Sequence, residues 1–371
     1  MLKQILTAVA LCILVCACSD NAMPVSGLDP EAFKTDSTAL YVITNHNGME
    51  ACFTNFGARL VSLCVPGADG KLRDVVLGFG DIKTYTSNST SFGALVGPYA
   101  NRIARGHFSL DGVDYNLEIN NGVNCIHSGS RGWRHSCFKF ISQSENSLTF
   151  SITKPAGQFG LPGDVNLSVT YTLTDDNKFD IVYEASTTAP TVLSITNHTF
   201  FNLSGDYQKT VLEDVLSVDA DRITPVDETM IPTGEYLPVE GTPFDFRTPK
   251  LIGADINAND VQLALADGYD HNFVLNHPGD DSVVAASFYC PASGIRMDVY
   301  TDQPGIQVFT ANAPNPTAVF KDGKLQTARA ALCLETQHFP DSPNHPQFPT
   351  TVLRPGEKFF SHTAYGFTTE K

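Results

Sequence analysis

The sequence has few basic residues and few charged residues of either sign. Of its 371 residues, 24 are Lys or Arg and 40 are Asp or Glu, which gives a formal net charge of −16 at pH 7. Charged residues make up 17 % and hydrophobic residues 42 %, which is typical of a folded globular protein and not of a disordered one. Since no basic surface is available to neutralise phosphates, nucleic acid is excluded as a partner.

The chain also lacks an apolar run of the roughly 18 residues that a membrane-spanning helix needs. Its first apolar run, Ile5 to Ala17, follows Lys3 and has the length of the central region of a secretory signal peptide. It ends in Ala17-Cys18, a small residue before a cysteine, which resembles the lipobox of bacterial lipoproteins. The resemblance implies a signal peptide over 1–17, cleavage before Cys18 and a lipid on that cysteine. We therefore expect an exported protein that faces the periplasm and touches the membrane only through its lipid anchor; a plain signal peptide is the alternative.

Cysteine pairs of the CxxC type are absent, so a zinc knuckle is unsupported. Six cysteines follow the predicted signal peptide, and the exported compartment would permit disulfides between them. A chain of this length can bury a sizeable core without such cross-links. We therefore predict that most of the six are buried thiols: Cys52, Cys64, Cys125, Cys137, Cys290 and Cys333.

Alternating apolar residues dominate the rest of the chain. Leu167, Val169, Tyr171 and Leu173 share one face of a segment, and similar alternation occurs over 179–183, 295–299 and 306–310. This period of two, bounded by Gly, Pro, Asp and Asn, indicates half-buried strands. Residues 258–266 are one short helix candidate. The pattern predicts an all-β fold, a large antiparallel β-sandwich that forms a single domain over 36–371 after a polar tether over 18–35.

Several segments are rich in polar and ionisable residues but lack strand alternation. Planar polar groups bind hydroxyls and aromatic faces pack on C–H surfaces, so the mixture suits a neutral polyol such as a sugar. The segments are Asn101-Arg102-Ile103, His127-Ser128-Gly129, Asn197-His198-Thr199-Phe200-Phe201-Asn202, Tyr269-Asp270-His271-Asn272-Phe273 and Leu334-Glu335-Thr336-Gln337.

These segments resemble the motifs of the aldose 1-epimerase (galactose mutarotase) family. Further matching blocks occur in the family's order, so that the resemblance spans roughly residues 40 to 367. They include Asn55-Phe56-Gly57-Ala58, Arg105-Gly106, His338-Phe339-Pro340-Asp341 and Leu353-Arg354-Pro355-Gly356-Glu357.

The resemblance implies a galactose-mutarotase-like β-sandwich (a supersandwich) that interconverts the α and β anomers of a free aldose such as galactose or glucose, without a cofactor or metal. It implies that Glu335 is the general base, His198 the general acid and His127 a supporting active-site histidine. The implied sugar ligands are Asn101, Arg102, Asp270 and Gln307. The monosaccharide is then the only expected partner, and the oligomeric state stays open.

The chemistry of mutarotation asks for these residue types. The C1 hydroxyl must lose a proton while the ring oxygen gains one, which suits a carboxylate and an imidazolium. Reference pKa values of about 4.3 and 6.5 leave Glu335 ionised and His198 mostly neutral at pH 7. Carboxylates such as Asp270 are expected to favour the protonated form of His198.

Three other functions are compatible with the same residues. Asp270 and Glu335 could be the acid/base pair of a glycoside hydrolase, although His198 argues against a pair of working carboxylates. A non-catalytic sugar-binding lipoprotein would need the aromatics and hydroxyl ligands but not Glu335 and His198 together. A metal-dependent lyase or isomerase would use histidines and Asp270 as ligands, but no HxH or HExxH spacing supports it. Trp133, the only tryptophan, is either a sugar platform or a core residue.

Overall fold

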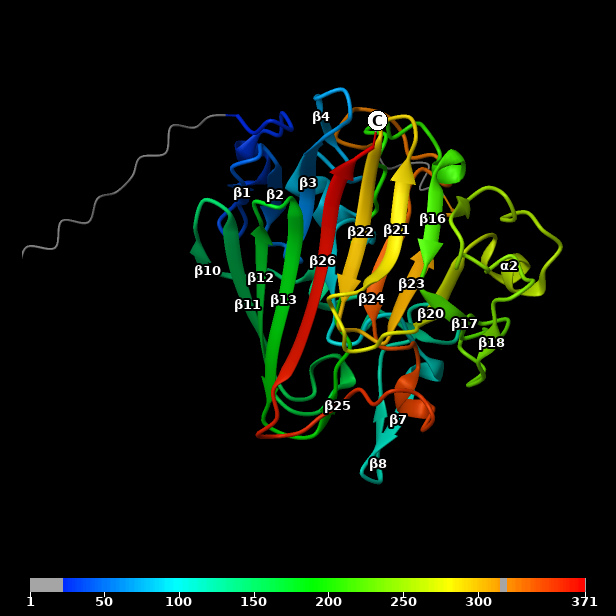
Figure 1. The fold of residues 1–371 in the computed structure, drawn as a ribbon. Coiled ribbons are helices and arrows are strands. Elements are labelled where there is room, and N and C mark those ends of the chain that lie inside the picture. The colour runs from blue at the N-terminus through cyan, green and yellow to red at the C-terminus, as the bar shows by residue number, and fades with distance from the viewer. Residues whose placement is uncertain (1–22, 314–318, 371) are drawn as a thin grey trace, which may run out of the picture.

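The computed structural model describes residues 23–313 and 319–370, and in these parts most regular structure is β-strand (Figure 1). The largest sheet has nine strands, all paired in antiparallel fashion. In spatial order they are β10 (Lys139–Gln143), β11 (Ser147–Lys154), β12 (Val165–Leu173), β13 (Lys178–Thr187), β26 (Phe359–Thr369), β22 (Ile295–Thr301), β21 (Val284–Cys290), β16 (Val215–Val218) and β19 (Lys250–Leu251).

A second sheet of five strands lies against the first. Figure 1 shows β20, β23 and β24 behind the strands β22, β21 and β16. Side chains from both sheets form one core cluster, with Phe273 and Val308 from the second sheet and Phe288 and Met297 from the first. The five strands, in spatial order, are β18 (Leu237–Pro238), β17 (Ala220–Ile223), β20 (Asp270–Leu275), β23 (Gly305–Phe309) and β24 (Cys333–Gln337).

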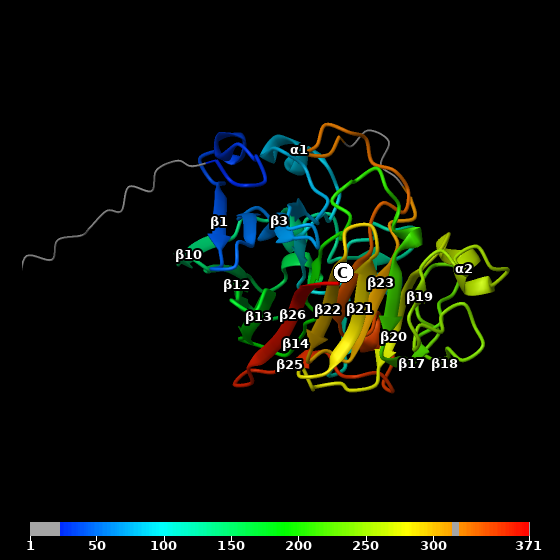
Figure 2. The ribbon, with the colours of Figure 1, turned by 45° about the horizontal axis from the view of Figure 1, so that its top comes forward.

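The N-terminal part forms a four-stranded sheet that covers the other half of the large sheet. Its strands are β1 (Leu40–Thr44), β2 (Glu50–Thr54), β3 (Arg59–Pro66) and β4 (Leu72–Asp74). Phe53 of β2 stacks on Tyr171 of β12, with ring centroids 4.7 Å apart. Figure 2 shows β1 and β3 over β12 and β13. The predicted antiparallel β-sandwich is thus confirmed, with one large sheet facing two smaller ones.

Short strand pairs carry several of the polar motifs to the end of the five-stranded sheet. Each pair is antiparallel, and three of the four join segments that are distant in sequence, whereas the pair over 107–116 is a hairpin. The pairs are β5 (Ala94–Val96) with β15 (Thr196–His198), β6 (Arg102–Ile103) with β9 (Cys125–Ile126), β7 (His107–Leu110) with β8 (Val113–Asn116), and β14 (Thr191–Val192) with β25 (Val352–Leu353).

Helices are short. The helix expected within 258–266 is α2 (Val261–Ala266), which begins after Asp260, whose carboxylate accepts hydrogen bonds from Gln262 and Leu263 N–H groups. The other α-helix is α1 (Ile82–Ser87), and single 3₁₀ turns occur at Pro30–Phe33, Ala104–Gly106, Trp133–His135, Gln158–Gly160, Val211–Glu213 and Ser342–Asn344. Within the described ranges, no helix has the length and apolar character needed to span a membrane.

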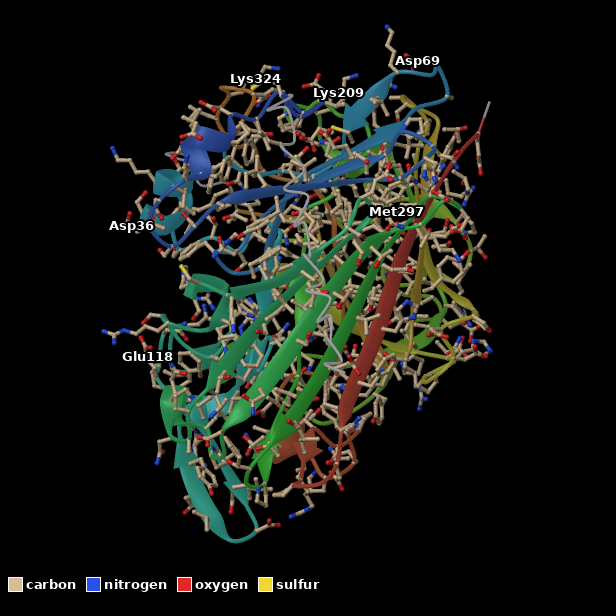
Figure 3. All side chains as sticks on the ribbon, turned by 90° about the vertical axis from the view of Figure 1, so that its left-hand side faces the viewer. Asp36, Asp69, Glu118, Lys209, Met297 and Lys324 are labelled. Atoms are coloured by element: carbon tan, nitrogen blue, oxygen red, sulfur yellow. The ribbon has the colours of Figure 1, made fainter. Side chains whose placement is uncertain are left out.

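The core is apolar, and many charged residues lie at the periphery. Figure 3 shows Asp69 and Lys324 at the rim, where both are exposed, whereas Met297 is fully buried. The cysteine prediction is confirmed for five of the six thiols after residue 22, which are buried and unpaired; Cys137 is exposed and also unpaired. Cys18 and the predicted signal peptide lie outside the described residues.

The segment before residue 36 is partly folded. Leu28 and Phe33 are buried in a cluster with Phe56 and Leu77, whereas Met23 and Val25, earlier in the same stretch, are exposed. Asp29 accepts a hydrogen bond from the Glu31 N–H and so caps the short turn that places Phe33. The folded unit therefore takes in the second half of the stretch that the sequence suggested as tether.

Candidate active site

The candidate site lies on one face of the five-stranded sheet. Gln307 of β23 is directly opposite both Glu335 of β24 and Asn272 of β20, and residues so paired point to the same face. Asp270 shares this face because it lies two residues before Asn272. His271, between them, points the other way and is fully buried. Strand alternation thus gathers polar side chains from three motifs on a single face.

His198 reaches the same site from the strand pair β5–β15. The N–H of Gly93 donates a 2.9 Å hydrogen bond to the His198 carbonyl oxygen. Gly93 has a φ of 63°, and a Cβ there would lie 1.9 Å from the Leu60 carbonyl oxygen, so only glycine permits this approach. Nε2 of His198 lies 3.6 Å from Oε1 of Glu335. This separation is too long for a hydrogen bond, so each group stays available to a third partner.

Burial governs the protonation of this pair. It raises the pKa of Glu335 well above its usual range, the charge of Asp270 raises it further, and Arg102 lowers it. Burial also lowers the pKa of His198 to about 3, with the positive charge of Arg134 acting in the same direction. The expected stabilisation of an imidazolium by neighbouring carboxylates is therefore wrong, because the cost of burying the charge dominates.

His127 is held by a tight turn together with Asn101. Both residues have positive φ angles, 58° for Asn101 and 54° for His127. The Asn101 N–H donates to Nδ1 of His127 at 3.1 Å, and the His127 N–H donates to the Asn101 carbonyl oxygen at 2.9 Å. Burial lowers the pKa of His127 well below its usual value. Because Nδ1 accepts a hydrogen bond, the hydrogen of the neutral ring is on Nε2, which can donate to a ligand.

Arg102 adjoins this turn at the start of β6. Its side chain is buried, and Nε donates a 3.0 Å hydrogen bond to Oδ1 of Asn121. Its positive charge lowers the pKa of both Glu335 and His127, so the guanidinium is within electrostatic reach of both. A fixed guanidinium of this kind is suited to donate to hydroxyl oxygens of a neutral ligand.

Asp270 and Gln307 form a hydrogen-bonded pair on neighbouring strands. Nε2 of Gln307 donates to Oδ1 of Asp270 at 2.7 Å. Gln307 is buried and Asp270 is partly exposed, and Oε1 of Gln307 has no described hydrogen-bond partner. The pair therefore offers acceptor oxygens in a fixed orientation, as a ligand with several hydroxyl groups requires.

The chain matches the family model of aldose 1-epimerase over residues 39–366. It belongs to the aldose 1-epimerase family. It is 39 % identical to a galactose mutarotase from Sus scrofa over 311 residues, and this aligned region covers 84 % of this chain and 88 % of that protein. It is 36 % identical over 333 residues to an aldose 1-epimerase from Escherichia coli K12, which covers 89 % and 95 %. The enzyme is accordingly an isomerase that interconverts the α and β anomers of an aldose.

Solved structures of related epimerases have the same fold. An aldose epimerase homologue from C. elegans superposes with a TM-score of 0.83 at 31 % identity and covers 90 % of this chain and 100 % of its own. A galactose 1-epimerase from Lactobacillus acidophilus gives a TM-score of 0.80 at 27 % identity, with 91 % and 97 % covered. The family resemblance drawn from the motifs is thus confirmed.

The structure brings most of the predicted residues of this epimerase together. The rings of His127 and His198 are 5.5 Å apart and edge to face. The turn that holds His127 therefore lies beside His198, which in turn lies next to Glu335. Asn101 uses its described hydrogen bonds on the chain itself: its Oδ1 accepts from the Arg102 N–H, so it shapes the turn. Which of these residues bind or transform the sugar stays a prediction.

Other residues have structural positions. Trp133 is fully buried in the core, where its ring meets Gly97, so it is not a sugar platform. His107 is exposed and lies 3.5 Å from Asp114 on the β7–β8 hairpin. Among the residues that the structure describes, no three His, Cys, Asp or Glu side chains are grouped as a metal site.

Sequence reasoning assigned no role to three neighbours of the His198–Glu335 pair. Phe200 and Phe309 contact the His198 ring, with ring centroids 4.9 and 6.3 Å away. Arg134 donates from Nη1 to the His127 carbonyl oxygen at 2.8 Å. Phe200 lies inside the motif around His198, so its place two residues further along an extended segment was the available signal. The position of Arg134 depends on how the chain turns after His127, which no local pattern indicates.

Proposed function

We propose that this epimerase opens and closes the ring of a free hexose by acid/base catalysis shared between Glu335 and His198. The observation that carries the proposal is the approach of the two side chains, with Nε2 and Oε1 3.6 Å apart in a buried site. The C1 hydroxyl and the ring oxygen of a pyranose are bonded to the same carbon. Glu335 can therefore act on one of these oxygens while His198 acts on the other.

The proposed reaction begins when Glu335 takes the proton of the C1 hydroxyl and His198 gives a proton to the ring oxygen. The bond between C1 and the ring oxygen breaks, and an open-chain aldehyde results. Rotation about the C1–C2 bond presents the other face of the carbonyl. Ring closure then reverses both proton transfers and gives the other anomer. A positioned acid or base contributes a factor on the order of 10² to 10⁴ in rate.

The protonation of the pair supports these roles. Burial favours a neutral Glu335 and a neutral His198. A carboxylic acid beside an imidazole carries as many protons as a carboxylate beside an imidazolium. Moving one proton from Glu335 to His198 therefore prepares both roles without exchange with solvent. Hydroxyl groups of the bound sugar would favour the charged form by donating to the carboxylate.

The remaining polar groups would hold the sugar by its other hydroxyls. Asp270 and Gln307 supply acceptor oxygens, Arg102 supplies donors, and His127 donates from Nε2. Asn101 fixes the turn that carries two of these groups. We propose galactose or glucose as the aldose, because the relatives named galactose mutarotase resemble this chain over most of its length.

We further propose that the enzyme acts outside the cytoplasm as a lipoprotein attached through Cys18. The support is the sequence itself, namely the apolar run from Ile5 to Ala17 followed directly by a cysteine. Attachment to a membrane would then come from acyl chains.

Polarimetry tests the proposed function directly. Freshly dissolved α-galactose and α-glucose are followed to equilibrium with and without the purified protein, before and after exhaustive chelation. We expect faster equilibration of both sugars and no effect of chelation, since both proton transfers are assigned to side chains. Loss of activity that a divalent ion restores would overturn this mechanism, and reducing sugar released from a glycoside would point to a hydrolase.

A further inference from the structure

The two histidines of the site are held in place by different means. Nδ1 of His127 accepts a hydrogen bond from the Asn101 backbone, which fixes the orientation of that ring. Nδ1 of His198 is buried and has no described hydrogen-bond partner. Its Nε2 is 3.6 Å from Glu335, beyond hydrogen-bond distance. Hydrogen bonds therefore do not determine the plane of the His198 ring.

Aromatic packing surrounds the His198 ring instead. The Phe200 ring is stacked on it, with centroids 4.9 Å apart and an interplanar angle of 11°. Phe309 and His127 approach edge to face, at 88° and 76° to the imidazole plane. Phe200 is the only one of these three rings that lies parallel to the imidazole, so it is the contact that defines the ring plane.

Phe200 is itself firmly anchored. Its carbonyl oxygen accepts a 2.9 Å hydrogen bond from the Leu77 N–H. Its ring packs on Phe92 with centroids 4.4 Å apart, and both side chains are buried. The stacked surface under His198 is thus part of the apolar core and has little freedom to shift.

We propose that Phe200 is a positioning residue for His198, whose ring face keeps Nε2 directed at Glu335 and at the ring oxygen of the sugar. This inference rests on the proposed role of His198 as the general acid. Proton transfer requires Nε2 within hydrogen-bond reach of the acceptor, so a tilted imidazole transfers more slowly even when the sugar binds normally.

The decisive variant is Phe200→Leu, with Phe79→Leu as the matched control. Phe79 lies in the same aromatic cluster, but its described ring pairs include neither Phe200 nor His198. Both variants should lower the melting temperature, because each removes a buried ring. Only Phe200→Leu should lower kcat, by about tenfold, with KM nearly unchanged, and Phe200→Tyr should restore kcat to within about threefold of wild type. Equal losses of kcat in Phe200→Leu and Phe79→Leu would overturn the inference.

A double-mutant cycle shows whether Phe200 acts through His198. In a His198→Asn background, Phe200→Leu should cause no further loss of kcat, because the group it positions is gone. If His198→Asn is slow and Phe200→Leu slows it again by the same factor, the inference about Phe200 fails while the proposed function stands. If His198→Asn retains wild-type kcat, the assignment of the general acid and the inference fail together.

Discussion

Gln307 and Glu335 are directly opposite each other on β23 and β24, so the amide and the carboxyl share one face of the five-stranded sheet. The register that pairs them sets the whole site. A slip of one residue would turn Glu335 into the core and bring the apolar Leu334 to the polar face. Because Leu334 is fully packed in the core cluster, the wrong register would lose its burial as well.

Replacement of Glu335 by Gln should nearly stop catalysis. The amide keeps the shape of the side chain but does not accept the proton, so we expect kcat to fall by roughly 10²- to 10⁴-fold with a much smaller change in KM. Anomer equilibration is followed optically, and the melting temperature is measured as a control for folding. A variant that equilibrates fresh α-anomer as fast as the wild type would refute the role of Glu335.

The effects of losing the acid and the base should not be independent. His198→Asn should lower kcat as Glu335→Gln does, through the ring oxygen. Because both groups act on one concerted event, the double variant should lose less activity than the product of the two single losses. The three variants are compared in the same optical assay. Losses that multiply would show that the two residues serve separate steps.

Asp270→Ala and Arg102→Ala should weaken binding of the sugar. A hydrogen bond to a charged group contributes about 1.5–3 kcal/mol, so kcat/KM should fall roughly tenfold to a hundredfold, with KM rising. For Asp270 the loss also frees the Gln307 amide that donates to it. Initial rates over a range of sugar concentrations separate KM from kcat. An unchanged KM in both variants would contradict their role as hydroxyl ligands.

The pH dependence of stability should show the charge of His362. The carboxylate of Asp180, 3.9 Å from Nε2, and that of Asp281, which is hydrogen-bonded to Nδ1 at 2.6 Å, raise the pKa of this half-buried imidazole to about 9. A pKa raised above the unfolded value of about 6.5 contributes stability that is fully present below pH 6.5 and is lost as the pH rises through 9. His362→Gln should therefore lower the melting temperature clearly at pH 6 and much less at pH 10.

His46 provides the control for that experiment. It pairs with Asp175 at 3.0 Å, but its side chain is 75 % exposed. Exposed ion pairs contribute little, so His46→Gln should change the melting temperature only slightly at either pH. If His362→Gln has the same effect at pH 6 and pH 10, the ion pairs of His362 do not contribute to stability in the proposed way.

Cys18→Ser tests the location of the enzyme. We expect the wild type to fractionate with membranes, because bacterial lipoproteins carry several acyl chains, and the variant to become soluble or to remain unprocessed. Cell fractionation with detection of the protein in each fraction gives the answer. Wild-type protein in the soluble fraction would refute the lipobox interpretation.

The sequence alone indicated several of the strands, the family and the candidate site residues. The alternation of Leu167, Val169, Tyr171 and Leu173 predicted the strand β12, because a strand with one buried face must alternate. Glu335 and His198 stood out because they lie in motifs with a family order. The polar character of those motifs also predicted that they would meet at a ligand site, although they are up to 234 residues apart, from Asn101 to Glu335.

Only the tertiary structure decided how those residues behave. Burial among neighbouring elements lowers the pKa of the His198 imidazole, and a single sequence does not reveal that burial. The turn shared by Asn101 and His127 and the burial of Trp133 depend on contacts between segments far apart in the chain. Phe200 is close to His198 in sequence, but the core that holds it there includes the distant Phe92. Leu28 and Phe33 likewise fold onto the domain because a distant apolar cluster is there to receive them. Local patterns specify which face of a strand is apolar, whereas side-chain protonation and orientation follow from what the fold packs against that side chain.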